Sequence, residues 1–211
     1  MLERILAENG IAVTDEQINK FALYREYLTE YNEKVNLTSI TDPDGIDVKH
    51  FADSVLLLKY LDIPAGAAVC DVGTGAGFPG VPLLIMRNDI KLTLIEATAK
   101  KLVFVDSLLE KLGLSARCVH GRGEELSRLP EFGGRFDVVT ARAVAALPKL
   151  AGYCLPLVRK GGVFAAMKGD PSPEELADGE KALAKLGGKI EKVSRYGLNG
   201  EKRCIMTVRK K

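Results

Sequence analysis

Apolar side chains recur at helical spacing in the first part of the chain. They stand at Ile18, Phe21, Ala22, Tyr24, Leu28 and Tyr31. This spacing predicts one face of an amphipathic helix. Thr14 and Gln17 have the spacing of a capping box, so the helix is expected to run from Asp15 to about Glu33.

A second helix is expected after the turn residues TDPDG at 41–45. It should run from about Ile46 to Tyr60. Its predicted inward positions are Val48, Ala52, Val55 and Leu56. Together the two helices would form a helical region of about sixty residues before the pattern changes.

Beyond Ala67, short apolar runs alternate with helical stretches. Strands are expected at 68–72, 91–97, 116–120, 136–142 and 162–168, with helices near 80–87, 98–112, 144–158 and 173–186. Strands that alternate with helices predict a parallel sheet covered by helices on both faces.

Two further apolar runs, 189–198 and 202–210, are separated by Asn199-Gly200, a strong tight-turn signal. The parallel sheet should therefore close with an antiparallel hairpin. That is the usual outline of the α/β, Rossmann-like fold of class I S-adenosylmethionine (SAM)-dependent methyltransferases. We expect a helical extension over 1–62, packed on a Rossmann-like domain over 63–211.

Composition limits the classes of protein that fit. Hydrophobic residues fill 46% of the 211 positions, which suffices for one α/β domain with a modest addition. A net charge of +2 neither demands nor excludes a nucleic-acid partner. No apolar run approaches the roughly 18 residues of a membrane span. The first ten residues are too short and too acidic for a signal peptide.

The four cysteines, Cys70, Cys118, Cys154 and Cys204, form no CxxC pair. Buried free thiols are therefore expected, with no metal site and a cytoplasmic location. No exposed apolar stripe calls for a dimer, so a monomer is expected.

The stretch CDVGTGAGFPG at 70–80 has the form of a strand, a glycine loop and a helix start. Gly73, Gly75 and Gly77 make the pattern G-x-G-x-G. A dinucleotide fingerprint would place its third glycine at 78, which is Phe78. Asp71, two residues before the first glycine, would repel a pyrophosphate but favour the ammonium and sulfonium of SAM. The loop therefore favours SAM over NAD, although Asp71 could instead serve only as a cap.

Two more acidic positions follow strand ends. Glu96 ends the second expected strand, where an acidic residue accepts hydrogen bonds from ribose hydroxyls in either cofactor class. Gly123 and Glu124, after the third strand, are candidates for holding the adenine. A plain helix start with acids at its positive end explains them nearly as well.

Several stretches together carry a specific resemblance. They are DVGTGAGFPGVPL, YNEKVNLTSITDP (31–43), KHFADSV (49–55), GRGEEL (121–126) and VTARAVAAL (139–147). From about Tyr31 to Lys168 the chain resembles the GidB (RsmG) family of bacterial 16S rRNA (guanine-N7)-methyltransferases.

This resemblance implies SAM as methyl donor. It implies as acceptor the N7 of one guanine, nucleotide 527, in the decoding-region loop of 16S rRNA. Carried over by motif, the donor-binding residues would be Gly73, Phe78, Glu96, Ala97, Thr98, Gly123, Glu124 and Arg142. The loop argument adds Asp71, Gly75 and Gly77. The partner would be 16S rRNA, the small ribosomal subunit or an assembly intermediate.

The implied chemistry requires no general base, because guanine N7 already carries an in-plane lone pair. The enzyme would have to align N7, the methyl carbon and sulfur. Arg142, at the end of the fourth strand, is the candidate to orient the base or hold the donor carboxylate. Its alternative is an ion pair with Glu124 or Glu125.

Basic residues that follow strand ends should form one rim for RNA phosphates: Lys100, Lys101, Arg122, Arg142 and Lys168. His50 is a further candidate for RNA binding if it reaches the substrate pocket; the alternative is a buried helix residue. Its helix and Asn36 would form a lid or wall beside the donor. The basic tail 209–211 is expected to fray in solvent.

Three alternatives remain open on the sequence. One is a methyltransferase for a small molecule or a protein. Another is an NAD-dependent oxidoreductase, against which Phe78 and Asp71 argue. The last is a non-catalytic RNA-binding or assembly protein that keeps an idle donor pocket.

Overall fold

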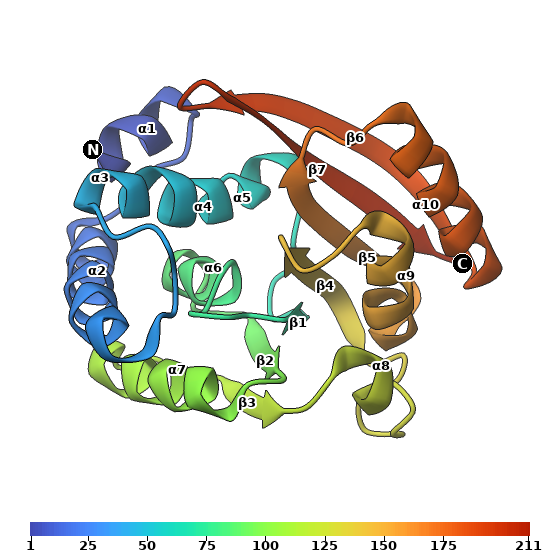
Figure 1. Cartoon of the computed structure of the whole chain (residues 1–211), viewed down its shortest axis with the longest axis horizontal. Helices are drawn as coiled ribbons and strands as arrows, with labels where there is room; N and C mark the ends of the chain where they lie inside the picture. The colour runs from blue at the N-terminus through green and yellow to red at the C-terminus, as the bar shows by residue number, and fades with distance from the viewer.

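A seven-stranded sheet organises the protein (Figure 1). The computed structural model describes all residues, 1–211. The strand order is β3-β2-β1-β4-β5-β7-β6. The strands are β1 (Ala68–Val72), β2 (Lys91–Glu96), β3 (Arg117–His120), β4 (Phe136–Arg142), β5 (Val158–Gly169), β6 (Gly188–Leu198) and β7 (Glu201–Lys210). β1 to β5 pair in parallel, and β7 is antiparallel to both of its neighbours. The expected sheet and closing hairpin are confirmed.

Helices cover both faces of this sheet (Figure 1). They are α1 (Leu2–Glu8), α2 (Asp15–Val35), α3 (Pro43–Gly45), the π-helix η1 (Ile46–Ala52), α4 (Asp53–Val55), α5 (Leu57–Tyr60), α6 (Gly80–Met86), α7 (Ala99–Leu112), α8 (Gly123–Leu126), α9 (Leu147–Cys154), the 3₁₀ turn η2 (Leu155–Leu157) and α10 (Pro173–Lys185). Residues from α1 to α7 share one hydrophobic core with the sheet, and α9 and α10 form a second core on the other face.

The start of α2 follows from its capping box. Thr14 Oγ1 accepts from Gln17 N at 3.3 Å, and Gln17 Oε1 accepts from Thr14 N at 2.9 Å. The helix buries Phe21, Tyr24 and Leu28. Ala22, which the spacing had included, lies exposed because it is rotated away from that stripe.

The helix expected over 46–60 is interrupted. Its predicted inward residues are buried, but the segment forms η1, α4 and α5 instead of one α-helix. Arg142 of β4 donates to the carbonyl oxygens of Lys49 and His50, and Ser54 Oγ also donates to that of His50. Side chains thus donate to backbone carbonyls that accept only from the backbone in a regular α-helix. This accounts for the wider, π-helical turn of η1.

The helix expected over 144–158 is also shorter than predicted. It occupies only Leu147–Cys154, because Pro156 cannot continue it. The strand then begins at Val158 rather than 162. Residues 143–146 form a loop in which Ala143 has a left-handed φ of 54°.

The β6–β7 hairpin turns at Asn199 and Gly200, whose φ angles of 49° and 77° are those of a type I′ turn. Its tip lies against the N-terminal helices: Lys49 pairs with Glu201, and Tyr196 stacks on Tyr60 at 5.4 Å. The far end of β7 runs to Lys210. The basic tail therefore continues β7, and Lys210 Nζ donates to the carbonyls of Leu155 and Pro156, which corrects the expectation that the tail frays.

The four cysteines are unpaired, with Cys118 half-buried and the others buried. None of the helices combines the length and apolar character that a membrane crossing requires.

Candidate functional site

Two cavities open at the carboxyl ends of the parallel strands, and they share Arg142 and Ala143. The glycine-loop cavity, of about 290 Å³, lies beside the loop after β1 and the ends of β2 and β3. The arginine cavity, of about 370 Å³, lies between η1, the end of β4 and the β6–β7 tip. In open α/β sheets ligands bind at this edge, where the strand order reverses, here between β1 and β4.

The loop after β1 requires glycine where it faces the cavity. Gly73 has φ = 69°, and a Cβ there would lie 2.8 Å from Val144 Cγ2. Val144 therefore closes over the loop from the β4–α9 connection.

The amides of this loop are turned into the protein. Gly73 and Thr74 donate to the carbonyl of Ile95, at 2.9 and 3.2 Å. Gly77 and Phe78 donate to the carbonyl of Thr74. A dinucleotide loop offers such amides to a pyrophosphate, and these are already used.

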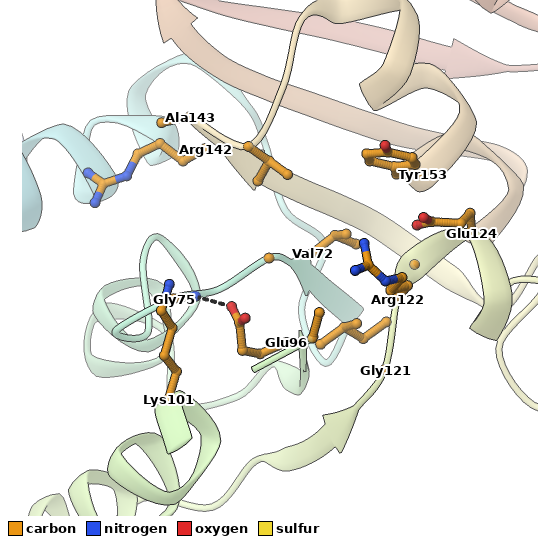
Figure 2. Close-up of a pocket in the computed structure, with 15 residues that line it drawn as sticks. Val72, Gly75, Glu96, Lys101, Gly121, Arg122, Glu124, Arg142, Ala143 and Tyr153 are labelled. Carbon is orange, nitrogen blue, oxygen red and sulfur yellow. Dashed lines mark hydrogen bonds between the residues drawn. The ribbon is translucent and has the colours of Figure 1, made fainter. Parts of the chain in front are cut away.

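Glu96 is held at the cavity wall with acceptor capacity to spare. Its Oε2 accepts from Gly75 N at 2.9 Å (Figure 2). Its Oε1 accepts from Thr98 N, also at 2.9 Å. The side chain is almost buried. Each carboxylate oxygen keeps a free lone pair, so the group is positioned to receive two hydroxyls.

The opposite wall is formed by α8 and α9. A Cβ on Gly123 would lie 2.8 Å from the carbonyl oxygen of Tyr153, so only glycine lets the two helices approach here. Glu124 and Tyr153 line the cavity beside it (Figure 2).

Of the expected donor-binding residues, seven line the glycine-loop cavity: Gly73, Gly75, Glu96, Ala97, Gly123, Glu124 and Arg142. Asp71, Gly77, Phe78 and Thr98 do not. Thr98 contributes through its amide on Glu96.

Asp71 lies beneath the loop, fully buried. Its Oδ1 accepts from Thr140 Oγ1 at 2.9 Å and its Oδ2 from Gly80 N at 3.1 Å. Burial raises the pKa of this carboxyl to about 6, against the lowering effect of its hydrogen bonds. Asp71 therefore fixes the start of α6 and does not line the cavity, where the sequence had suggested direct contact with the donor.

Arg142 turns away from the glycine-loop cavity toward η1 (Figure 2). Its side chain is 8% exposed and its Nη1 lies 3.1 Å from Asp53 Oδ2. It pairs with neither Glu124 nor Glu125, the partners considered from the sequence. The guanidinium thus stands at the wall between the two cavities, with a fixed orientation.

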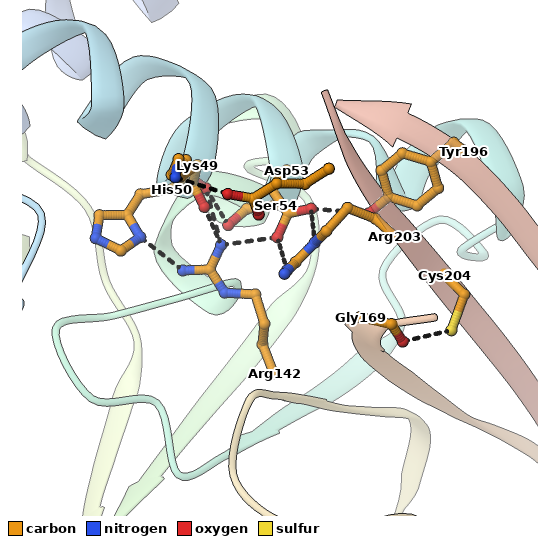
Figure 3. Close-up of polar contacts among 10 residues, drawn as sticks. Lys49, His50, Asp53, Ser54, Arg142, Gly169, Tyr196, Arg203 and Cys204 are labelled. Carbon is orange, nitrogen blue, oxygen red and sulfur yellow. Dashed lines mark hydrogen bonds and ion pairs between the residues drawn. The ribbon is translucent and has the colours of Figure 1, made fainter. Parts of the chain in front are cut away.

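Asp53 is the centre of a buried polar cluster (Figure 3). It also accepts from Arg203 Nη2 at 2.7 Å, Arg203 Nε at 3.2 Å and Tyr196 Oη at 2.8 Å. Four hydrogen bonds fill both carboxylate oxygens. The cluster ties α4 to β4 and to both strands of the C-terminal hairpin.

His50 is fixed in one protonation form by its neighbours. Arg142 Nη2 can only donate, so the His50 Nδ1 at 3.1 Å accepts, and Nε2 carries the proton toward Thr38 Oγ1 at 2.8 Å. The ring stacks on Phe78 at 4.4 Å. Burial first, and then the Arg142 charge, lower the pKa of His50 to about 3. His50 is therefore a neutral wall of the arginine cavity, not a cation for phosphate.

The expected basic rim is only partly assembled. Lys101 and Arg122 line the glycine-loop cavity, and Lys100 is exposed on α7. Lys168 is ion-paired with Glu175 and its side chain is only 14% exposed, so it is not a free rim cation. Asn36 caps the end of α2 and lines neither cavity; Ser39 and Ile40 stand at the arginine cavity instead.

Sequence reasoning missed Arg203 and Tyr196, which reach Asp53 from 150 and 143 residues away. It also missed Tyr153 and Val144 at the glycine-loop cavity. No local pattern marks them. The Asn-Gly turn predicted the hairpin, but not that its tip would fold back over η1.

Known proteins resemble this chain closely. Residues 17–205 match the family described as "GidB: rRNA small subunit methyltransferase G". The ribosomal RNA small subunit methyltransferase G of Exiguobacterium sibiricum is 46% identical over 209 residues, covering 98% of this chain and 88% of the relative. The protein of that name from Lactobacillus acidophilus is 45% identical, covering 97% and 88%.

Solved structures show the same fold at low identity. A SAM-dependent methyltransferase from Aquifex aeolicus has a TM-score of 0.60 at 19% identity, covering 82% of this chain and 96% of its own. A methyltransferase from Pyrococcus furiosus has a TM-score of 0.61 at 15% identity, covering 92% and 99%. The fold is that of class I SAM-dependent methyltransferases, as the sequence pattern predicted.

Proposed function

The chain belongs to the GidB family of rRNA small subunit methyltransferases, and we propose that it transfers a methyl group from SAM to N7 of a single guanine in 16S rRNA. The observation that carries the proposal is the pair of adjoining cavities that share Arg142 and Ala143. One cavity suits an adenosine cofactor and the other suits a planar base. The NAD alternative is set aside by the family match and by the inward-turned loop amides.

The residues of the glycine-loop cavity fit SAM. Each carboxylate oxygen of Glu96 keeps a free lone pair that can accept a hydrogen bond from a ribose hydroxyl. Gly123 lets α8 approach the backbone of Tyr153 on α9, and the wall formed in this way, with Glu124, is the place for the adenine. Lys101 is a cation for the methionine carboxylate. When bound, SAM supplies an electrophilic methyl group.

The arginine cavity is the proposed acceptor site. Arg142, oriented by Asp53, keeps donor capacity toward O6 of guanine, which leaves the lone pair of the neighbouring N7 free to attack the methyl group. His50, stacked on Phe78, offers a flat neutral wall against which a base can pack. These residues position the base; none of them exchanges a proton.

The buried groups at the junction support transfer without a general base. Asp53 has no free acceptor position, and His50 Nδ1 is engaged by Arg142. Burial also raises the pKa of Tyr196 above its usual value. Guanine N7 needs no proton removed before it attacks, so alignment and exclusion of water are the contributions asked of the protein.

The experiment that tests the proposal offers three acceptors side by side. Purified protein is incubated with methyl-labelled SAM and with small subunits lacking the modification, naked 16S rRNA, or large subunits. We expect label on RNA at no more than one methyl per small subunit and none on large subunits. Label that reaches no RNA while SAM still binds would support the small-molecule or protein acceptor instead.

A further inference from the structure

The arginine cavity must offer acceptors as well as donors if guanine is its ligand, as proposed above. Guanine presents N1–H and N2–H side by side, two donors that a single carboxylate can accept together. Adenine presents an unprotonated N1 at the same place. A free carboxylate in the cavity would therefore select guanine over adenine.

Only two carboxylates line this cavity, Asp53 and Glu201. Asp53 is 1% exposed and already accepts four hydrogen bonds from Arg142, Arg203 and Tyr196. It cannot accept from a base without losing one of them. Glu201 is therefore the carboxylate of this cavity that can accept hydrogen bonds from a base.

Glu201 stands at the start of β7, next to the hairpin turn. Its side chain is 51% exposed, and its one partner is Lys49, with Nζ 2.7 Å from Oε1. Oε2 has no partner in the protein. Lys49 is itself 38% exposed, and an exposed ion pair of this kind contributes little, so its members exchange partners readily. The hydrogen bond from Lys49, and then its charge, lower the pKa of Glu201 in this state.

We propose that Glu201 is a specificity-determining residue that accepts the N1–H and N2–H of the target guanine. Lys49 is then released and pairs with an RNA phosphate beside the cavity. Guanine is then read from two sides, by Arg142 at O6 and by Glu201 at N1–H and N2–H, and N7 is left free. This inference rests on the proposed function.

The test removes one hydrogen-bonding group from each partner. Small subunits are reconstituted on 16S rRNA carrying guanosine or inosine, which lacks the N2 amino group, at the methylated position. Single-turnover rates are measured for the wild type and for Glu201→Gln. Glu191→Gln is the matched control, since Glu191 also pairs with a basic residue on this hairpin but lines neither cavity. Thermal melting shows that each variant is folded.

We expect the wild type and Glu191→Gln to prefer guanosine over inosine by tenfold or more. In Glu201→Gln this preference should fall to within about threefold. Lys49→Ala should weaken RNA binding but keep the preference, because it leaves the carboxylate in place. A Glu201→Gln enzyme that transfers methyl and keeps the full preference overturns this inference alone. A wild type that methylates neither RNA overturns the proposed function with it.

Discussion

The protonation of His50 links a single residue to the pH dependence of the fold. Burial, and then the charge of Arg142, lower the pKa of its ring to about 3 from the ordinary 6.5, and the ring stacks on Phe78. The native state therefore binds fewer protons than the unfolded chain between these values. The contribution of neutral His50 to the free energy of unfolding is therefore fully present above pH 6.5, and it is lost as the pH falls toward 3.

At pH 5 this loss amounts to about 2 kcal/mol, from 1.5 pH units at 1.36 kcal/mol each. We expect His50→Gln to remove that part of the acid destabilisation. The measurement is the free energy of unfolding in urea at pH 7.5 and pH 5.0. Asp71, whose raised pKa acts in the opposite sense, is present in both proteins and cancels in the comparison. His120→Gln is the control. If the free energy of unfolding of His50→Gln falls between pH 7.5 and pH 5.0 by as much as that of the wild type, His50 is protonated in the folded protein.

A substitution of Glu96, another single residue, tests whether the glycine-loop cavity binds SAM. A glutamine there has one acceptor oxygen, so its amide must face the N–H of either Gly75 or Thr98. We expect Glu96→Gln to raise the Kd for SAM at least tenfold, about 1.4 kcal/mol, as measured by titration calorimetry. Glu125→Gln, an exposed neighbour on α8, should bind as the wild type does. Equal affinities for the two variants would remove Glu96 from the donor site.

At the scale of elements, the approach of α8 to α9 sets the shape of the glycine-loop cavity. Gly123→Ala would place a Cβ 2.8 Å from the backbone of Tyr153 and push the helices apart. We expect weaker SAM binding and a loss of about 1–3 kcal/mol of stability. Gly152→Ala, on α9 with nothing within 4 Å, should be neutral or slightly stabilising. If both variants bind SAM equally well, this wall does not contact the cofactor.

The elements also divide by how far the sequence could predict them. The α2 boundaries, the strand sequence and the hairpin follow from periodicity, capping and Asn199-Gly200, which are local signals. The prediction of a single helix over 46–60 was wrong. Arg142, far along the chain, donates hydrogen bonds to the carbonyls of Lys49 and His50, and no local pattern signals this. Glu96 could be placed because a strand end fixes it. The Asp53 cluster could not, because its partners come together only when the hairpin folds over η1.

For the whole molecule, we propose that residues 1–62 are an extension packed on the methyltransferase domain over 63–211. Eleven of the 32 buried residues in the larger core come from this extension. It also supplies Asp53, the partner of Arg142 and Arg203. We therefore expect a 63–211 fragment to bind a hydrophobic dye, measured by dye fluorescence. We also expect it to melt without cooperativity, measured by circular dichroism. A fragment that melts as sharply as the full chain would show that the core does not need the extension.

The central claim for the whole molecule is that the two cavities join a SAM donor to the N7 of one guanine without a general base. The most direct measurement is the identity of the methylated nucleoside after the protein acts on unmodified small subunits, by complete digestion and mass spectrometry. The account predicts 7-methylguanosine at a single position. A methyl group on N1 or on the exocyclic N2 would contradict it, because the account assigns those N–H groups to Glu201 in the arginine cavity and leaves the N7 lone pair free for the methyl group.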